Sequence, residues 1–86
     1  PLEDEKVYQN EIPFKKGDRI LLFTDGVIEA KNSGGDEYGD ERLEAFFIEN
    51  EDLQVGPFNQ KLLNELNRFT GNDLKDDVFI LSILTK

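Results

Sequence analysis

The sequence predicts an α+β fold in which two helices pack on a mainly antiparallel sheet. Two strands are expected at about 19–24 and 77–85, because their largely apolar stretches, at 20–23 and 78–84, have the pattern of strands that are buried on both faces. Two other stretches, at 40–50 and 57–70, repeat apolar residues at the spacing of one helix face. A more polar stretch at 6–14 alternates loosely and predicts a third strand.

The first two strands are expected to form a β-hairpin. Val7, Ile12 and Phe14 are the apolar points of the first strand, and the charged turn at 15–18 contains Gly17. A short polar connector with a glycine suits neighbouring antiparallel strands. Because the first strand is the more polar one, we expect it nearer an edge of the sheet, with both apolar strands in the centre.

The apolar run at 19–24 stops abruptly at Asp25 and Gly26, where the chain must turn. Asp25 then stands at the end of a rigid element, a position suited to holding a metal ion. Residues 27–30 are long enough for one helical turn, and 31–37 form a polar, glycine-containing loop that we expect to be mobile.

The two longer helices carry start and stop signals. Asp40 is a candidate N-cap for the first, and Pro57 suits the first position of the second, where a backbone N–H has no partner in the helix. Gly71 is expected to end the second helix. Four phenylalanines recur at helical spacing and are expected in the core: Phe46, Phe47, Phe58 and Phe69.

The sheet has more apolar surface than these helices can cover. Both apolar strands present such residues to both faces, but two helices cover only one face. The other face requires a second layer, which 86 residues are too few to supply. Because the chain contains no methionine, we expect Pro1 to be a boundary within a longer protein.

Composition argues against several classes of function. A formal net charge of −9 argues against nucleic acid and an anionic membrane surface as partners. No apolar run approaches the roughly 20 residues that cross a bilayer, and no signal peptide opens the chain, so we expect a cytoplasmic protein. The sequence has no histidine and no cysteine, which leaves oxygen ligands and favours a hard cation such as magnesium, manganese or calcium.

Two acidic positions meet at one end of the predicted sheet. Asp25 follows one apolar strand and Asp76 precedes the other, and these ends coincide if the strands are antiparallel neighbours. Carboxylates held together with no basic residue between them repel unless a cation bridges them. Alternatively both are ordinary turn residues, because Asp-Gly and Asp-Asp are favoured in loops.

The motifs of this chain, taken in order, resemble the C-terminal half of a known enzyme family. Residues 17–30 read GDRILLFTDGVIEA, 35–39 read GDEYG and 76–78 read DDV. In this order they resemble the bacterial type 2C-like metal-dependent protein phosphatases, the PPM family, in its sporulation stage II and sigma-factor regulation branch. The Thr-Asp-Gly-Val-x-Glu-Ala block and the closing Asp-Asp are the most specific parts.

That resemblance implies a fold, a cofactor and a site. Residues 1–86 would be a single, partial phosphatase domain, forming part of an α-β-β-α sandwich. Asp25 and Asp76 look like ligands of Mn²⁺ or Mg²⁺, and Asp77 is a lesser candidate because many relatives carry asparagine there. Glu29 belongs to the matched block but is not expected to be a ligand. No side chain is a nucleophile, since a metal-activated water hydrolyses the phosphoserine or phosphothreonine of a protein.

One departure from the family limits the expected activity. The early aspartate-glycine motif that bridges both metals in the family is absent from this chain, so only half of the metal site is present. We expect the missing half upstream of Pro1 and no activity from the isolated fragment. The expected partners are a phosphorylated protein substrate in bacterial signal transduction, such as an anti-sigma factor antagonist, and an upstream half domain or sensory domain.

Other functions stay open at this point. The chain could be a non-catalytic interaction module, a pseudo-phosphatase remnant that binds a protein partner through its uncovered sheet face. Residues 34–38, GGDEY, nearly spell the signature of diguanylate cyclases but lack its hairpin between apolar strands. A calcium-binding acidic domain is disfavoured, because no loop alternates ligands as such sites require.

Overall fold

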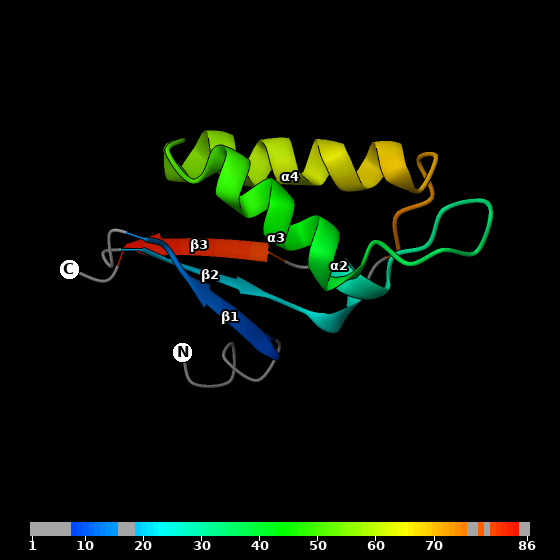
Figure 1. Cartoon of the computed structure of the whole chain (residues 1–86), viewed down its shortest axis with the longest axis horizontal. Coiled ribbons are helices and arrows are strands. Elements are labelled where there is room, and N and C mark those ends of the chain that lie inside the picture. Colours follow the sequence, from blue (N-terminus) through cyan, green and yellow to red (C-terminus); the bar gives the residue numbers. More distant parts are fainter. Residues whose placement is uncertain (1–7, 16–18, 76–77, 79, 85–86) are drawn as a thin grey trace.

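Strand β2, Arg19–Phe23, is the middle strand of a three-stranded antiparallel sheet in the described part of the chain. Strand β1, Asn10–Pro13, pairs with one side of it, and strand β3, Ile80–Leu84, pairs with the other (Figure 1). Within this sheet the first strand is an edge strand, as the sequence predicted. The computed structural model describes residues 8–15, 19–75, 78 and 80–84.

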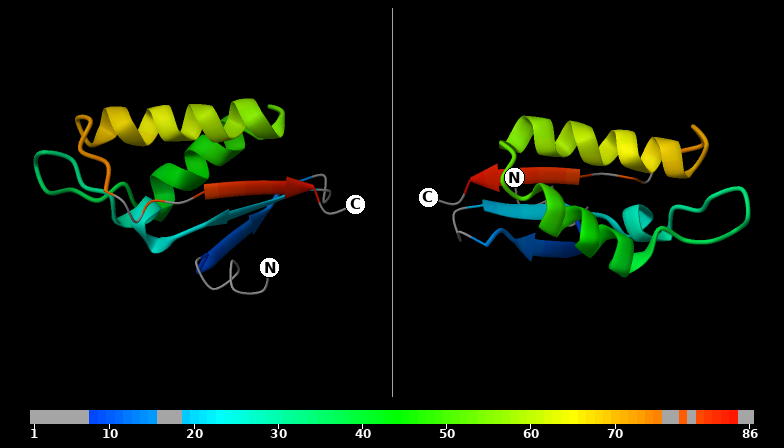
Figure 2. Two further views of the ribbon diagram at one scale, coloured as in Figure 1. Left: turned by 180° about the vertical axis from the view of Figure 1, so that it is seen from behind. Right: turned by 45° about the horizontal axis from the view of Figure 1, so that its top comes forward.

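Three helices occur in the described residues: α2 at Asp25–Glu29, α3 at Gly39–Asn50 and α4 at Val55–Phe69. Figure 2 shows α3 and α4 on the same face of the sheet, with the short α2 at the end of β2. None of the helices in this part of the chain is both long and apolar enough to span a membrane. The antiparallel sheet with helices on one face confirms the predicted α+β class.

The two faces of β2 differ because side chains alternate along a strand. Leu21 and Phe23 point to the face that the helices cover and are buried, whereas Ile20 and Leu22 on the opposite face are half-buried. The described helices therefore leave apolar side chains of β2 on the other face only partly covered. This is the uneven coverage that the sequence predicted.

The position of the last strand differs from the prediction. The sequence placed both apolar strands in the centre of the sheet, but in the described sheet only β2 has a neighbour on each side, and β3 lies at an edge. The predicted strand covered 77–85, of which residues 77, 79 and 85 lie outside the described residues, as does Gly17 in the predicted hairpin turn.

Both long helices begin earlier than the sequence predicted. Helix α4 starts at Val55, which makes Pro57 its third residue; a proline is tolerated there because none of the first four N–H groups has a partner within the helix. Helix α3 starts at Gly39 with Tyr38 as its N-cap, so Asp40 lies in the first turn and is not the cap. Gly71, with a φ of +67°, follows the end of α4, as expected of a helix stop.

An aromatic cluster between the sheet and the helices forms the core. Phe58 is fully buried, and its ring centroid lies 5.2 Å from that of Phe14, 5.6 Å from that of Phe46 and 5.7 Å from that of Phe47. The rings meet edge to face, which is a favourable geometry for aromatic pairs. Phe69 is partly buried and packs against the same core, so all four helical phenylalanines lie where the sequence predicted.

Arg19 connects the start of β2 to the loop between α3 and α4. Its guanidinium donates from Nη1 to the carbonyl of Leu53 (2.5 Å) and from Nη2 to the carbonyl of Glu51 (2.6 Å). The same group lies 4.0 Å from the ring centroid of Phe14. The planar, forked arginine suits this combination of two acceptors and an aromatic face. This contact fixes the helices to the end of the sheet that is distant from Asp25.

The loop at 31–37 is closed at its base by backbone pairing. Lys31 and Glu37 form an antiparallel bridge, and the next residue, Tyr38, donates its N–H to the carbonyl of Ala30 (2.7 Å). Inside the loop, Oδ1 of Asn32 accepts two backbone N–H groups at 2.9 Å each. The two ends of the loop therefore lie side by side, next to the end of α2.

Tyr38 gives the fold a defined response to alkaline pH. Burial raises the pKa of its phenol above the ordinary value of about 10, and the carboxylate of Glu65 raises it further. A raised pKa in the folded state means that the associated stability is complete below about pH 10 and is lost as the pH rises beyond it. We expect Tyr38→Phe to reduce the fall in unfolding free energy between about pH 10 and 11, measured by denaturant titration. The same change at Tyr8 is the control, and an equal effect of both substitutions would contradict this account.

Candidate functional site

Asp25 lies where the sequence predicted, directly beyond the end of β2. The strand ends at Phe23, Thr24 is the N-cap, and Asp25 is the first residue of α2. Gly26 and Val27 are buried while the side chain of Asp25 is exposed. The buried part of α2 thus anchors the turn, and the carboxylate projects to the surface from a packed element.

The pairing register brings the start of β3 to the same end of the sheet. Phe23, the last residue of β2, pairs with Ile80, the first residue of β3. Strand β3 therefore begins at the end of β2 that Asp25 follows. Asp76 and Asp77, the other predicted ligands, lie outside the described residues.

Two side chains of the N-terminal segment contact Asp25. Nδ2 of Asn10 donates to Oδ1 of Asp25 (2.8 Å), and Oε1 of Gln9 accepts the backbone N–H of Asp25 (2.9 Å). Neither residue was predicted from the sequence. The signal that was available is the antiparallel register, which pairs Asn10 with Phe23 and so places the start of the first strand beside the end of the second.

The donor chemistry of Asp25 fits a hard divalent ion, although the ligand set is incomplete. Its exposed carboxylate is the type of oxygen ligand that Mg²⁺ and Mn²⁺ prefer. Among the described residues, no group of three or more His, Cys, Asp or Glu side chains is close enough to hold a metal. The described part of the chain therefore contributes a single predicted ligand, and any complete centre needs ligands beyond it.

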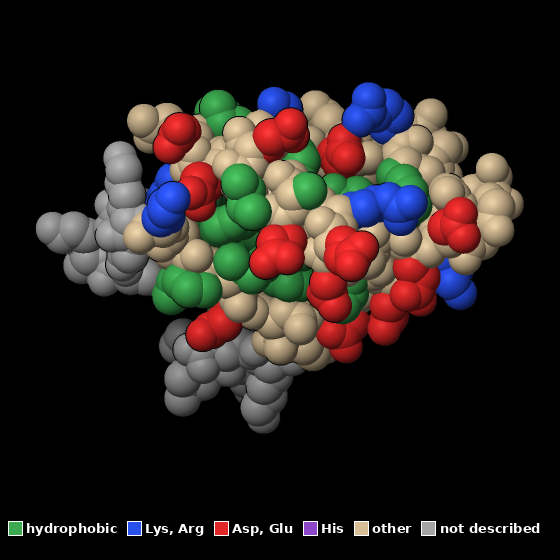
Figure 3. Space-filling model, viewed as in Figure 1, with side chains coloured by type: hydrophobic (Ala, Val, Ile, Leu, Met, Phe, Trp, Pro, Cys, Tyr) green, Lys and Arg blue, Asp and Glu red, His purple; other side chains and the backbone are tan. Residues whose placement is uncertain are grey.

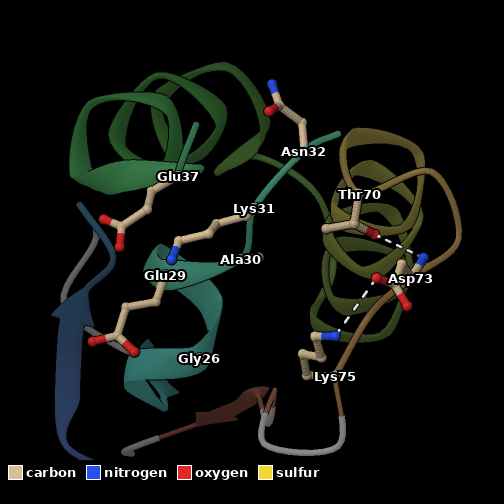
Figure 4. Close-up of a pocket in the computed structure, with 9 residues that line it drawn as sticks. All are labelled: Gly26, Glu29, Ala30, Lys31, Asn32, Glu37, Thr70, Asp73 and Lys75. Atoms are coloured by element: carbon tan, nitrogen blue, oxygen red, sulfur yellow. Dashed lines mark hydrogen bonds and ion pairs between the residues drawn. The ribbon is translucent and has the colours of Figure 1, made fainter. Parts of the chain in front are cut away.

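A pocket of about 380 Å³ lies beside α2 (Figure 4). Its lining includes Gly26, which follows Asp25 in the chain, and Lys75, which precedes Asp76. The pocket thus lies between the chain segments that carry the two main predicted ligands. The remaining residues that line it are Glu29, Ala30, Lys31, Asn32, Glu37, Thr70 and Asp73.

The lining of this pocket is polar and carries both signs of charge. Lys75 pairs with Asp73 at 3.5 Å, and the N–H of Asp73 donates to Oγ1 of Thr70 (3.3 Å). Figure 4 places Glu29 and Lys31 on the opposite side of the space from these residues. Glu29 lines the pocket together with Lys31. Such a surface suits a polar peptide segment better than an apolar ligand.

A second hollow, of about 590 Å³, lies between β1 and α3. Its apolar lining includes Ile12, Leu43 and Ile48, and Ile48 is 68% exposed although it is a large hydrophobic residue. Asp40 and Glu44 are among its charged lining residues. Figure 3 shows hydrophobic side chains open to the surface between acidic ones on this side of the molecule. The hollow is far more apolar than the pocket beside α2.

Comparison with protein-family models gives one match that covers the whole chain. Residues 1–86 match the family described as Stage II sporulation protein E (SpoIIE). Searches of the curated proteins and of the solved structures give no significant match.

Proposed function

Because the chain belongs to the Stage II sporulation protein E family, we propose that it is the C-terminal part of a metal-dependent protein serine/threonine phosphatase. The family is generally one of type 2C-like phosphatases related to bacterial sporulation. The observation that carries the proposal is the position of Asp25, an exposed carboxylate at the end of a packed strand, opposite the start of β3. A metal ligand needs that combination of rigidity and access.

In this proposal the chain contributes the later ligands of a metal centre. Asp25 and Asp76 would hold the metal through their carboxylates, and Asp77 would hydrogen-bond nearby. Bound Mn²⁺ or Mg²⁺ supplies an activated water and neutralises charge on the phosphoryl group. No histidine or cysteine nucleophile is needed, in agreement with the composition of the chain. The remaining ligands would come from an upstream half of the domain, and we expect the fragment alone to be inactive.

The proposed substrate is a regulatory protein phosphorylated on serine or threonine, such as an anti-sigma factor antagonist in a cytoplasmic signalling pathway. The pocket beside α2 supports a protein substrate, because its polar, mixed-charge lining suits a peptide segment next to the reacting phosphate. Lys31 and Lys75 are the cationic side chains in that lining. A sensory domain preceding the phosphatase would regulate its activity.

The hollow between β1 and α3 favours a second candidate function, a non-catalytic interaction module. An apolar surface with an exposed Ile48 is a common feature of protein-binding sites. Three acidic lining residues against one lysine, Lys15, would favour a partner segment that carries basic residues around an apolar anchor. Under this alternative the chain is a pseudo-phosphatase remnant that binds a protein partner.

Metal removal from the complete phosphatase domain tests the proposal against this alternative. The domain is assayed on a phosphoserine protein with Mn²⁺, then with a chelator, and then with excess Mn²⁺. We expect turnover to disappear with the chelator and to return with the metal, since the activated water depends on the ion.

A heat-denatured sample carried through the same sequence controls for metal-catalysed background hydrolysis. Turnover that persists at full rate in the chelator would overturn the metal-dependent mechanism. A folded domain that never dephosphorylates the protein, with Mn²⁺ present, would favour the interaction module.

A further inference from the structure

Gln9 and Asn10 contact Asp25 at two different atoms. Asn10 donates from Nδ2 to the carboxylate oxygen Oδ1 at 2.8 Å, and Gln9 accepts the backbone N–H of Asp25 through Oε1 at 2.9 Å. One contact orients the side chain and the other fixes the backbone that carries it. Among the described residues, no hydrogen bond is made to the second carboxylate oxygen of Asp25.

The chemistry of the partners determines how both amides are oriented. Asn10 faces two acceptors, the Asp25 carboxylate and the carbonyl of Phe23 (3.4 Å), so its NH₂ end must point to them. Gln9 faces an N–H donor, so its oxygen must point there. Because Nδ2 of Asn10 lies near both the end of β2 and the carboxylate, it connects the strand to the predicted ligand.

The sheet register holds this arrangement in place. Asn10 pairs with Phe23, and the pairing continues through Glu11 with Leu22. Side chains alternate between the faces, so Glu11 projects from the opposite face of β1 to Asn10. A slip of one residue would remove Asn10 from Asp25 altogether. The contact of Asn10 with Asp25 is therefore a consequence of strand pairing, whereas Gln9 directly precedes β1.

We infer that Asn10 and Gln9 are positioning residues for the metal ligand Asp25. This inference rests on the proposed function, in which the Asp25 carboxylate binds Mn²⁺ or Mg²⁺. Asn10 orients the Asp25 carboxylate by donating a hydrogen bond to Oδ1, which leaves the second carboxylate oxygen available to bind the ion. Gln9 holds the first N–H of α2, so that the Asp25 backbone is fixed before the metal arrives.

A neutral donor is well suited to this task. An amide N–H orients a carboxylate without removing its negative charge, whereas a lysine or arginine would neutralise the charge that attracts the ion. Partners that hydrogen-bond to metal ligands typically change metal affinity by about 10–100-fold when they are mutated. We expect a change of that size here, because the pair fixes both the side chain and the backbone of one ligand.

The test uses the complete phosphatase domain and Mn²⁺ as the probe. Asn10→Ala and Gln9→Ala are prepared with Glu11→Ala as a matched control on the same strand. Mn²⁺ affinity is measured by calorimetry, and turnover is measured as a function of Mn²⁺ concentration. We expect about 10–100-fold weaker Mn²⁺ binding for Asn10→Ala and a smaller loss for Gln9→Ala. At saturating Mn²⁺, turnover of both variants should return to within a few-fold of the original value.

The outcomes separate this inference from the proposed function. If Asn10→Ala and Gln9→Ala bind Mn²⁺ as tightly as Glu11→Ala while Asp25→Ala loses binding, the positioning role is wrong and the metal site stands. If Asp25→Ala itself binds Mn²⁺ normally, the proposed function fails and the inference fails with it. A lower unfolding free energy of Asn10→Ala with unchanged Mn²⁺ affinity would indicate a purely structural contact and would also overturn the inference.

Discussion

Replacing Asp25 by alanine in the complete phosphatase domain is expected to lower manganese-dependent turnover by about a hundredfold to a thousandfold. A metal ion supplies several kcal/mol of transition-state stabilisation, and each 1.4 kcal/mol or so corresponds to a factor of ten in rate. The fold should tolerate the change, because the Asp25 side chain is exposed and the buried residues of α2 are its neighbours Gly26 and Val27. Turnover and the unfolding free energy are measured on the same preparation.

The control for this prediction is Asp52→Ala, which removes the same charge from an exposed position in the loop between α3 and α4. Both variants change the net charge equally, so a general electrostatic effect on substrate binding would appear in both. Near-normal turnover of the Asp25 variant at limiting Mn²⁺ would show that Asp25 is not a metal ligand.

Replacing Phe58 by alanine is expected to lower the unfolding free energy by about 3–5 kcal/mol. Phe58 is fully buried, and its ring meets those of Phe14, Phe46 and Phe47 at centroid distances of 5.2–5.7 Å. Its removal leaves a cavity bounded by side chains from a strand end and two helices, which cannot all move inward together. Because the unfolding free energy of a small domain is only about 5–15 kcal/mol, this one substitution would remove a large fraction of it.

The matching surface variant is Ile48→Ala, since Ile48 is the same class of residue but is 68% exposed. Its unfolding free energy should stay within about 0.5 kcal/mol of the original value. Denaturant unfolding of both variants in the complete domain measures the difference. Equal losses for Phe58 and Ile48 would mean that the aromatic cluster is not the core that stabilises the fold.

The sequence was most informative where one local pattern has one structural meaning. The segment at 19–24 is continuously apolar at 20–23, and residues 19–23 form the middle strand with Leu21 and Phe23 buried against the helices. The phenylalanines at helical spacing pack together because the 3.6-residue period places them on one face. The abrupt change from apolar run to Asp25 likewise predicted the end of β2 correctly.

Helix starts were less predictable, because several residues are acceptable in a first turn. Pro57 was expected at the first position of its helix but is the third residue, and Asp40 lies inside the first turn instead of at the cap. The first four N–H groups of any helix lack internal partners, so a proline or an acidic residue is compatible with more than one register there. Composition alone cannot choose between these registers.

The surroundings of Asp25 were not predicted, because they depend on contacts between residues that are distant in the chain. Gln9 and Asn10 are ordinary polar residues in the sequence, and only the pairing of Asn10 with Phe23 brings them to the carboxylate. The pocket beside α2 is likewise lined by both Gly26 and Lys75, which are almost fifty positions apart in the sequence. No local sequence pattern predicts that these two residues lie close together.

The central claim is tested most directly by a crystal structure of the complete domain. The crystals are grown with Mn²⁺, and the ions are located by their anomalous scattering. We predict an ion bound to a carboxylate oxygen of Asp25, with Asn10 still donating to the other oxygen and a second ligand from the segment before β3. Manganese bound elsewhere in the domain, with Asp25 in contact only with Gln9 and Asn10, would contradict the account.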